Sequence, residues 1–416
     1  MSLSSEIAVI VGAGHAGSEL VASLRQQGFA GRIILIGDEP ELPYRRPPLS
    51  KTYLSGEATR ESLAIRNAAA YDKLQVECRT GTQVLAIDRI KKNILLSDGR
   101  IQPYTKLVLA TGGRPRKLPD PAADKANVHY IRTLADIDRL QAQFSAGKHL
   151  LVIGGGYIGL EAASVGIKSG LRVTVLETAP RVLARVAAPE ISAFYERAHR
   201  ARGVDVRTGV SVQAFAGEQQ VQSVSLSDGS TLAVDLVIVG IGILPNDELA
   251  RSAGLEVDNG VVVDAFAQTA DPDILAVGDC AQHVNGFLAQ RLRIESVPSA
   301  QEQARTAAQT ICGKPLAHAA VPWFWSDQFD LKLQMVGLSQ GYEQLVLRGD
   351  PASESFSAFY LKDGVVLSVD AINRPQDFML AKRLVAERIA VSAEALADEQ
   401  ISLKSLLPEP VKAAGS

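Results

Sequence analysis

Two short glycine-rich segments are the parts of this chain whose residue types and spacing best suit chemistry. They are Gly12-Ala13-Gly14-His15-Ala16-Gly17 and Gly154-Gly155-Gly156-Tyr157-Ile158-Gly159. In this pattern the first glycine permits a tight turn and the second lets backbone N–H groups approach a pyrophosphate. The third lets a helix pack closely on a strand. One such segment would be weak evidence, because glycine turns are common, but two in one chain predict two nucleotide-binding sites.

Each glycine segment lies between the same kinds of element. A short apolar strand precedes it, a helical pattern follows it, and a second apolar strand then ends beside an acidic residue. The positive end of the helix dipole favours phosphate, and the carboxylate can accept hydrogen bonds from a ribose. The two copies are strands 7–11 and 149–153, helices 16–26 and 159–168, strands 33–36 and 173–176, and the acids Asp38 and Glu177.

The duplication continues beyond the two acids. Leu96-Ser97-Asp98-Gly99 and Leu226-Ser227-Asp228-Gly229 both predict a strand that ends in a hairpin turn. Each copy then closes with an apolar strand, at 107–110 before Thr111-Gly112-Gly113 and at 236–239 before Gly240-Ile241-Gly242. The whole order of elements occurs twice, which predicts an α/β fold with two Rossmann-like dinucleotide-binding domains.

The last part of the chain has a different pattern. Strands at 261–263 and 274–277 and a helix at 299–311 still fit the first two domains, but the composition changes after Pro322. From Trp323 on, the pattern alternates, which predicts strands at 331–336, 344–347, 357–361 and 365–369 and a helix at 377–387. We expect three domains: residues 1–114 with 245–322, residues 115–244, and a C-terminal α+β domain over residues 323–416.

The first site is followed by a proline-rich segment with three cations, Pro43-Tyr44-Arg45-Arg46-Pro47-Pro48-Leu49-Ser50-Lys51. A stiff segment beside a pyrophosphate site can place Arg46 on a phosphate or adenine and Lys51 near a flavin ring. A cation there would stabilise the negative charge that a reduced flavin carries around N1 and C2=O. The first site is therefore expected to bind FAD. The alternative for this segment is a solvent-exposed polyproline II loop.

Two other residues of the first site have alternative interpretations. Asp279 follows a strand and Gly278, a position that suits hydrogen bonds to the ribityl hydroxyls of FAD. Aspartate at such a junction also caps helices. His15, inside the glycine turn, is expected to be a loop residue that touches FAD and not an acid or base.

The second site is expected to bind NADH. Glu177 lies near the expected distance after Gly154, where a carboxylate accepts both ribose hydroxyls and repels a 2′-phosphate. Arg181 and Arg185 follow closely and could weaken this preference. Glu161, in the second helix, is expected to reach toward the nicotinamide and to pair with Lys51. Its alternative role is an ordinary interaction with the helix dipole in the first turn.

Composition argues against several other classes of protein. The 416 residues carry a net charge of −3 and no long basic run, which argues against nucleic-acid binding. Cys78, Cys280 and Cys312 are widely spaced and form no Cys-x-x-Cys pair, so we expect no disulfide scaffold, no iron–sulfur ligand set and no metal site. Residues 1–6 lack a basic region and no apolar run is long enough to span a bilayer. We therefore expect a cytoplasmic protein without a signal peptide or membrane span.

These motifs resemble those of the NADH-dependent ferredoxin reductases of bacterial cytochrome P450 and aromatic-ring dioxygenase systems, the putidaredoxin reductase family, with its glutathione-reductase-like fold. The resemblance covers nearly the whole chain. Besides the glycine turns it includes Ala110-Thr111-Gly112-Gly113-Arg114-Pro115 and Val277-Gly278-Asp279-Cys280. Its most specific segments are the proline–lysine segment and Pro322-Trp323-Phe324-Trp325-Ser326-Asp327-Gln328.

The resemblance adds three contacts to those inferred from the residues: Arg132 with FAD, Val297 against the flavin, and Trp325 at the edge of the ring. Packing at a domain interface is the alternative for Trp325, and Trp323 is the less favoured neighbour of the ring. The expected catalytic residues are Lys51, Glu161 and Trp325. The expected FAD-binding residues are Gly12, Gly14, His15, Ala16, Gly17, Asp38, Arg46, Pro48, Lys51, Thr111, Gly112, Arg132, Gly278, Asp279, Val297 and Trp325. The expected NADH-binding residues are Gly154, Gly156, Tyr157, Ile158, Gly159, Glu177 and Gly242.

The resemblance also implies a reaction. NADH binds over the flavin, its C4 hydride passes to N5, and two electrons leave singly for a small acidic [2Fe-2S] ferredoxin that docks near the flavin edge. That ferredoxin feeds a cytochrome P450 or a ring-hydroxylating oxygenase. Arg305 and Lys404 are candidate cations for this docking.

Related architectures with other acceptors carry cysteines beside the flavin. Disulfide reductases need two and peroxidase or oxidase types need one, whereas residues 47–51 contain none. This difference favours an external one-electron acceptor. The alternatives are a rubredoxin reductase or NADH oxidase, and a redox-sensing protein like the apoptosis-inducing factor.

Overall fold

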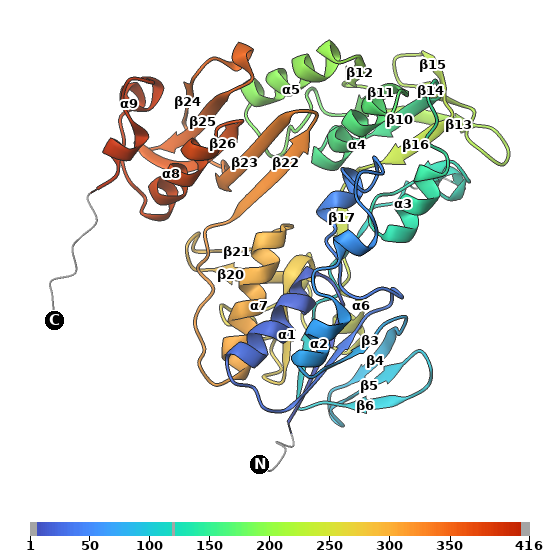
Figure 1. Cartoon of the computed structure of the whole chain (residues 1–416), viewed down its shortest axis with the longest axis vertical. Helices are drawn as coiled ribbons and strands as arrows, with labels where there is room; N and C mark the ends of the chain where they lie inside the picture. The colour runs from blue at the N-terminus through green and yellow to red at the C-terminus, as the bar shows by residue number, and fades with distance from the viewer. Residues whose placement is uncertain (1–5, 119–120, 409–416) are drawn as a thin grey trace. The chain divides into compact units, whose positions relative to one another are not determined.

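The computed structural model describes residues 6–118 and 121–408 (Figure 1). The chain divides into two compact units, each made of two segments. Unit 1 contains Met1–Gln143 and Val239–Ala320, and unit 2 contains Phe144–Ile238 and Val321–Ser416. The expectation that there is no signal peptide concerns residues 1–6, of which residues 1–5 lie outside the described part of the chain.

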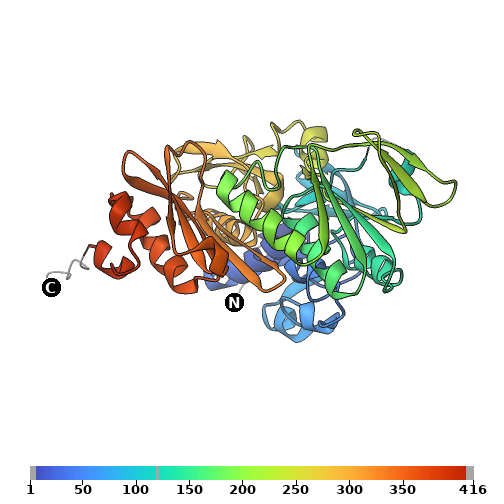
Figure 2. The same cartoon turned by 90° about the horizontal axis from the view of Figure 1, so that it is seen from above.

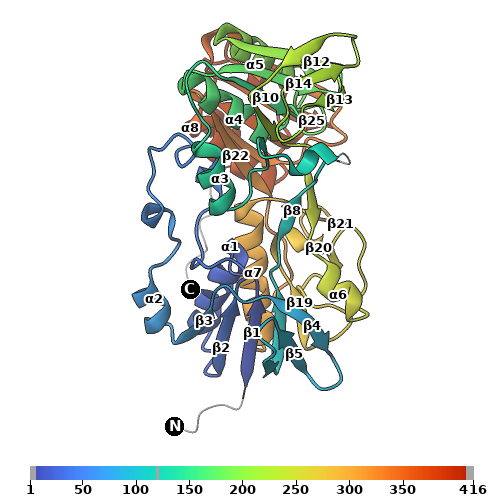
Figure 3. The same cartoon turned by 90° about the vertical axis from the view of Figure 1, so that its right-hand side faces the viewer.

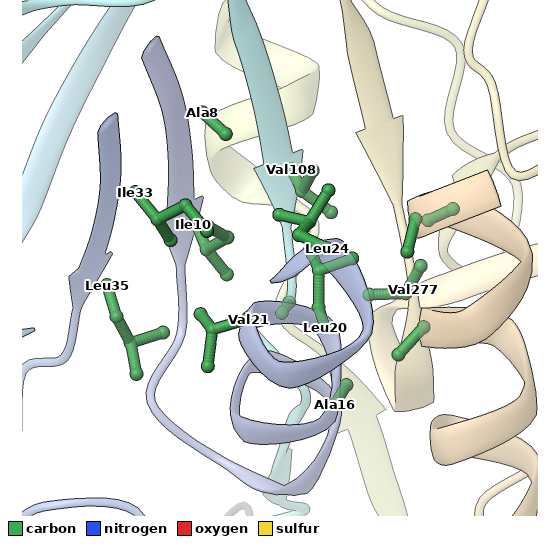
Figure 4. Packing of buried hydrophobic residues seen from close by; sticks show 14 of the residues in the cluster. Ala8, Ile10, Ala16, Leu20, Val21, Leu24, Ile33, Leu35, Val108 and Val277 are labelled. Atoms are coloured by element: carbon green, nitrogen blue, oxygen red, sulfur yellow. The ribbon is translucent and has the colours of Figure 1, made fainter. Parts of the chain in front are cut away.

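Unit 1 is built on a five-stranded parallel sheet in the order β19-β7-β1-β2-β3. Its middle strand is apolar throughout because both faces of the sheet are covered. Ala8 and Ile10 belong to a core cluster with α1 and α7, where Figure 4 shows Ile10 near Leu20 of α1. Val9 and Val11 belong to the cluster on the other face. The elements are β1 Ile7–Val11, β2 Arg32–Ile36, β3 Val76–Arg79, β7 Lys106–Leu109, β19 Ile274–Ala276, α1 His15–Gln26 and α7 Val297–Ile311.

Smaller elements complete unit 1. Figure 3 shows α1 beside α7, and Figure 1 labels the three strands of the antiparallel sheet β4-β5-β6. The strands are β4 Val84–Asp88, β5 Asn93–Leu96, β6 Ile101–Pro103, β8 Gly113–Pro115, β9 Val128–His129, β17 Ile243–Pro245, β18 Val261–Val262, β20 Ala281–Asn285 and β21 Gln290–Leu292. The helices are α2 Ala68–Lys73, α3 Leu134–Gln141 and α6 Glu248–Ser252, with 3-10 turns η1 Pro47–Ser50, η2 Glu61–Leu63, η3 Pro121–Asp124 and η4 Gly278–Cys280.

Unit 2 contains the second copy of the repeat and the C-terminal sheet. The second copy has strands in the order β12-β11-β10-β16 and an antiparallel sheet of β13, β14 and β15. Its elements are β10 His149–Ile153, α4 Tyr157–Lys168, β11 Arg172–Glu177, α5 Pro189–Ala201, β12 Val204–Thr208, β13 Val212–Ala216, β14 Ser223–Leu226, β15 Thr231–Ala233 and β16 Leu236–Val239.

The C-terminal segment forms an antiparallel sheet in the order β22-β23-β26-β25-β24. Helices α8 and α9, red in Figure 2, lie against this sheet. The elements are β22 Trp323–Gln328, β23 Leu331–Gly337, β24 Gln344–Arg348, η5 Pro351–Ser353, β25 Phe356–Lys362, β26 Val365–Ile372, α8 Pro375–Ala386, α9 Ala393–Ala397 and η6 Leu403–Leu406. None of the helices within residues 6–118 and 121–408 is long and apolar enough to cross a membrane.

The two copies of the repeat share one strand register. β1 pairs with β2 up to Val11↔Ile36, and β10 pairs with β11 up to Ile153↔Leu176. The residue that follows Ile36 is Gly37, and the residue that follows Leu176 is Glu177. Glu177 therefore corresponds in position to Gly37, and Asp38 lies one residue further along the chain.

Candidate functional site

The first glycine turn leaves an open face at the start of α1. Gly12 has a φ of +120°, and a Cβ there would lie 2.0 Å from the carbonyl oxygen of Ala110. A Cβ on Gly17 would lie 2.1 Å from the carbonyl oxygen of Gly12. A Cβ on Gly14, by contrast, would meet no atom of the described residues within 4 Å. Gly14 therefore borders free space at a helix N-terminus, where a pyrophosphate fits.

Three basic side chains, His15, Arg46 and Arg132, interact beside this turn. The Arg46 guanidinium donates to Glu39 at 2.6 Å and to the main-chain oxygen of Arg132 at 2.6 Å. Arg132 forms an ion pair with Asp279 at 3.6 Å. Burial, together with the charges of Arg46 and Arg132, lowers the pKa of His15 to about 4. His15 is therefore neutral at neutral pH, and the two guanidinium groups supply the positive charge that suits phosphates.

The proline-rich segment is folded and is not an exposed polyproline II loop. Pro47–Ser50 forms the 3-10 turn η1, in which Leu49 and Ser50 are buried. The interpretation of this segment as a solvent-exposed loop is therefore wrong. The half-buried Lys51 ends the turn, and its main-chain N–H donates to the carbonyl oxygen of Pro48 at 3.0 Å.

Asp279 lies in the 3-10 turn η4 at the end of β19. Gly278 has a φ of +80°, and a Cβ there would lie 3.2 Å from the Cβ of Ala16, so this turn lies against the start of α1. The helix-cap interpretation of Asp279 is wrong, because the residue lies inside η4 and Ser296 caps α7. Val297 is the first residue of α7 and is half-buried.

The segment after β7 joins the first site to a pair of short strands. The Thr111 hydroxyl donates to the main-chain oxygen of Asn246 at 2.6 Å, and Gly112 has a φ of +66°. These residues precede β8, which pairs with β17. Gly242, which we expect to bind NADH, precedes β17 and belongs to unit 1. Asp38 is exposed, just beyond the end of β2.

The second glycine turn repeats this geometry in unit 2. Gly154 has a φ of +110°. A Cβ on Gly159 would lie 2.1 Å from the Gly154 carbonyl oxygen, whereas a Cβ on Gly156 would meet no atom of the described residues within 4 Å. Tyr157 and Ile158 form the first turn of α4, and Ile158 is 41% exposed. The chain therefore has two open faces at helix N-termini.

Glu177 is held against the second glycine turn. Its carboxylate accepts hydrogen bonds from the main-chain N–H groups of Gly155 and Ala179, both at 2.8 Å. A Cβ on Gly155 would lie only 3.1 Å from the Glu177 Cβ. In the first copy the sizes are reversed: Ala13 occupies the first position, and a Cβ on Gly37 would lie 2.5 Å from the Ala13 Cβ. Only the second copy therefore has room for an acidic side chain at this position.

The two arginines that follow Glu177 differ in their surroundings. Arg181 is engaged within its own segment, since its guanidinium donates to Ser192 at 2.6 Å and to the main-chain oxygen of Ala187 at 2.8 Å. Arg185 is exposed. Arg181 is therefore held by hydrogen bonds within unit 2. Of the two arginines, Arg185 is the one that stays a candidate for weakening the preference for NADH.

Glu161 is a buried carboxylate in the second turn of α4. It is 1% exposed and accepts a hydrogen bond from the Ser326 hydroxyl at 2.6 Å. The first turn of this helix carries no acidic residue, so the interpretation of Glu161 as an ordinary first-turn residue is wrong. Lys51 belongs to unit 1 and Glu161 to unit 2, so their pairing stays a prediction.

The two tryptophans lie on β22 and point to the same face. Their ring centroids are 5.6 Å apart, and the Trp323 ring also lies 5.8 Å from that of Phe378 in α8. The Lys382 Nζ lies 4.2 Å from the centre of the Trp323 ring. Trp323 is therefore held within the C-terminal segment, and Trp325 keeps its predicted role at the flavin.

The two candidate docking cations also differ. Arg305 lies in α7 and forms ion pairs with Glu19 at 2.9 Å and Glu302 at 2.6 Å. Lys404 lies in η6 and is exposed. Two carboxylates already offset the charge of Arg305, so Lys404 is the better candidate for attracting an acidic partner.

Sequence reasoning missed the side chains that fix Arg46. The Tyr44 hydroxyl donates to Glu39 at 2.5 Å and accepts from Arg46 at 3.0 Å. Glu39 directly follows Asp38, and only Asp38 was predicted to have a role. Glu39, an acidic residue shortly before the arginines of the proline-rich segment, is the feature of the sequence that could have predicted this cluster.

Comparisons with known proteins agree with this geometry. A family model for pyridine nucleotide-disulphide oxidoreductases matches residues 7–304, and a reductase C-terminal model matches residues 323–407. The chain is 50% identical to putidaredoxin reductase of Pseudomonas putida over 96% of each chain. It is 41% identical to the ferredoxin–NAD(+) reductase component of the anthranilate 1,2-dioxygenase system of Burkholderia cepacia, over 97% of this chain and 100% of that relative.

A solved structure extends this similarity to three dimensions. The covalent complex of putidaredoxin reductase with putidaredoxin matches with a TM-score of 0.94 at 50% identity, over 97% of this chain and 98% of that chain. The expected fold class, cofactors FAD and NADH, and enzyme class are confirmed. The chain therefore belongs to the pyridine nucleotide-disulphide oxidoreductases and, within them, to the putidaredoxin reductase family of FAD- and NADH-dependent ferredoxin reductases.

Proposed function

We propose that this protein passes electrons from NADH through FAD to a small acidic [2Fe-2S] ferredoxin that serves a cytochrome P450 or a ring-hydroxylating oxygenase. The observation that carries this proposal is the pair of open glycine turns in a chain that is similar over 96% of its length to putidaredoxin reductase. Two such turns provide one site for each dinucleotide. The absence of cysteine from residues 47–51 favours an external acceptor over a thiol pair.

The residues of unit 1 fit FAD. Gly14 leaves room for the pyrophosphate, Arg46 and Arg132 supply positive charge, and Asp279 lies at a strand end where it can accept from ribityl hydroxyls. Bound FAD supplies the capacity to accept two electrons as a hydride and to release them singly. We assign FAD to residues 1–114 and 245–322, NADH to residues 115–244, and the outer edge of the flavin to the C-terminal domain of residues 323–416.

Three side chains are proposed to act on the reaction. Lys51 places a cation where negative charge accumulates on the flavin, and Glu161 pairs with Lys51. Trp325 covers the edge of the ring. The chain supplies neither a nucleophile nor a general base in this scheme, which agrees with the neutral His15 in the first turn. We place the reaction in the cytoplasm, where NADH is supplied and where the three free cysteines stay reduced.

Glu177→Ala is expected to weaken NADH binding by about 1–3 kcal/mol and to reduce discrimination against NADPH. The substitution removes the acceptor for the ribose hydroxyls and also leaves the N–H groups of Gly155 and Ala179 without their carboxylate. Glu177→Gln keeps an acceptor and removes only the charge. Steady-state kcat/KM with each nicotinamide cofactor measures the effect, with Glu190→Ala on the exposed start of α5 as the control. An unaltered protein that already prefers NADPH would show that this site is wrongly assigned.

Ferredoxin reduction is expected to slow steeply as ionic strength rises, while reduction of FAD by NADH changes little. Long-range attraction of an acidic partner weakens because the Debye length falls from about 30 Å at 0.01 M to about 10 Å at 0.1 M salt. Stopped-flow measurements with a panel of purified acidic [2Fe-2S] ferredoxins, and a rubredoxin for comparison, test both the partner and the salt dependence.

Charge reversal at the docking surface is expected to act like high salt. Lys404→Glu should slow ferredoxin reduction at low salt and leave NADH oxidation by a small-molecule acceptor unchanged. Arg305→Gln is the better change at the second position, because a glutamate there would lie beside Glu19 and Glu302. Ferredoxin reduction that is indifferent to salt would mean that docking is apolar and would remove both residues from the proposal.

A further inference from the structure

Four buried polar side chains form a continuous hydrogen-bonded chain in unit 2. His199 Nε2 lies 2.9 Å from Gln328 Oε1, Gln328 Nε2 lies 3.2 Å from the Ser326 hydroxyl, and that hydroxyl lies 2.6 Å from Glu161. His199, Gln328 and Ser326 are 0% exposed and Glu161 is 1% exposed. This hydrogen-bonded chain runs from α5 through β22 to α4. It ends on the carboxylate of Glu161, which we assign to the nicotinamide side.

The chemistry of these groups fixes the direction of the chain. The Gln328 oxygen can only accept, so His199 carries its proton on Nε2 and donates it. The Gln328 nitrogen can only donate, so the Ser326 hydroxyl accepts that bond and gives its single proton to Glu161. Every donor therefore points toward Glu161. Hydrogen bonds donated to a carboxylate stabilise its ionised form.

His199 is suited to the far end of this chain. Burial lowers the pKa of His199 to about 4, so the ring is neutral at physiological pH and carries a single proton, which the contact with the Gln328 oxygen places on Nε2. Among the described residues its Nδ1 has no hydrogen-bond partner. Leaving a buried ring nitrogen without a hydrogen bond costs stability. The other nitrogen of the His199 ring, Nε2, is the one that bonds to Gln328.

Strand β22 places these side chains by its alternation. Phe324, Ser326 and Gln328 share one face, where the Phe324 ring lies 5.1 Å from the ring of Tyr157 in α4. Trp323 and Trp325 lie on the other face. Trp325 and Ser326 are therefore consecutive residues of β22. Trp325 is the predicted neighbour of the flavin, and Ser326 donates to Glu161.

The titratable groups around Glu161 include Asp370 of β26, whose pKa burial raises to about 7 and which interacts with the same two tyrosines as Glu161, so the infrared band that Glu161→Gln identifies is needed to separate the two carboxyls. Tyr157 of α4 and Tyr195 of α5 interact electrostatically with Glu161, and burial raises the pKa of both well above the ordinary range. Both phenols therefore stay neutral. Asp327 is on the opposite face of β22 from Ser326, and Lys51 of unit 1 is the cation that we expect to pair with Glu161.

We propose that Ser326, Gln328 and His199 are positioning residues that hold the Glu161 carboxylate ionised and oriented for its partner on the nicotinamide side. This inference rests on the role that the proposed function gives to Glu161. Through it, the C-terminal segment controls the charge state of a residue in the NADH-binding domain. Ser326 is the decisive member of the three, because its hydroxyl is the group that donates to the Glu161 carboxylate.

The test compares Ser326→Ala with Ser326→Thr in the FAD-loaded protein. Without the donated hydrogen bond, the buried carboxylate should take up a proton more readily. The pH at which NADH reduces FAD at half its maximal rate should therefore rise by about one unit or more, which is a loss of about tenfold in rate at pH values well below the original midpoint. Threonine keeps the hydroxyl and should restore the unaltered profile. Gln328→Met, which frees the Ser326 hydroxyl to turn away from Glu161, should shift the profile in the same direction.

The matched control is Ser357→Ala. Ser357 is also 0% exposed and donates to a carboxylate, Asp377, at 3.0 Å in the same unit. Ser357→Ala removes a hydroxyl-to-carboxylate hydrogen bond that is not part of the hydrogen-bonded chain ending at Glu161. This substitution should lower the melting temperature without moving the pH profile.

Infrared difference spectroscopy gives a second readout that does not depend on turnover. Glu161→Gln identifies the carboxylate band of Glu161, and in Ser326→Ala that band should give way to a protonated carboxyl band at neutral pH. An unchanged band and an unchanged pH profile in Ser326→Ala would overturn the inference. If Glu161→Gln itself leaves reduction by NADH unaltered, the proposed role of Glu161 is wrong, and the infrared band then decides separately whether Ser326 holds the carboxylate ionised.

Discussion

Valine at Gly14 is expected to give a folded protein that no longer retains FAD, whereas valine at Gly156 is expected to retain FAD and lose its reduction by NADH. Both glycines have extended backbone conformations, with φ of −102° and −81°, which a β-branched residue tolerates. A Cβ at either position meets no atom of the described residues within 4 Å, so the fold has room for the new side chain. That side chain fills the space where a pyrophosphate would approach the helix N-terminus.

The expected loss is large because several interactions disappear together. Two charge-assisted hydrogen bonds of about 1.5 kcal/mol each correspond to about 100-fold in affinity. The flavin absorbance of the purified protein and the rate of its bleaching by NADH measure the two losses, and thermal unfolding confirms that both variants fold. Each variant is the control for the other. A Gly14→Val protein that keeps FAD and fails with NADH would mean that the two nucleotides are assigned to the wrong copies.

Lys51→Met is expected to lower the reduction potential of the bound FAD and to slow its reduction by NADH, with FAD still bound. The shift should be on the order of 30 mV, which equals about 1.4 kcal/mol for two electrons. Lys51 follows the turn η1, whereas Gly14, Arg46 and Arg132, which we propose to contact FAD, are untouched. Removal of the cation should therefore act on the charge of the flavin and not on retention of FAD.

Potentiometric titration and anaerobic stopped-flow measure these two effects. Lys73→Met, at the exposed end of α2, is the control for removal of a lysine charge elsewhere in unit 1. An unchanged potential in Lys51→Met would exclude the electronic role. Loss of FAD would instead make Lys51 a structural residue of the turn.

The parts of the fold that could be predicted are those whose cause is local. β1 and β10 were predicted with the bounds that the structure has, because strands buried on both faces are continuously apolar. The helix at 299–311 begins earlier, at Val297, because Ser296 caps it and Pro298 occupies its first turn. The two glycine turns were predicted from spacing, since their backbone geometry depends on the glycines themselves.

The parts that could not be predicted depend on distant partners. β22 was not among the predicted strands, because its three aromatic residues followed by three polar ones do not alternate between apolar and polar. Ser326 bonds to Glu161, which lies 165 residues earlier in the chain, and nothing in the local sequence signals that contact. The pairing of Lys51 with Glu161 and the approach of Trp325 to the flavin stay predictions for the same reason.

The reciprocal sizes at Ala13–Gly37 and Gly155–Glu177 limit how the two halves of this chain can exchange their specialisations. Glutamate at position 37 alone would collide with the Ala13 side chain, since even a Cβ would lie 2.5 Å from it. Alanine at position 155 alone would crowd Glu177, because its Cβ would lie 3.1 Å from the glutamate Cβ. A recombination event that moves the acidic residue from one half to the other must therefore carry both the glycine turn and the end of the following strand. A point substitution that enlarges a residue first creates a crowded intermediate, whereas Ala13→Gly before Gly37→Glu avoids it, so packing sets the order in which the two positions can change.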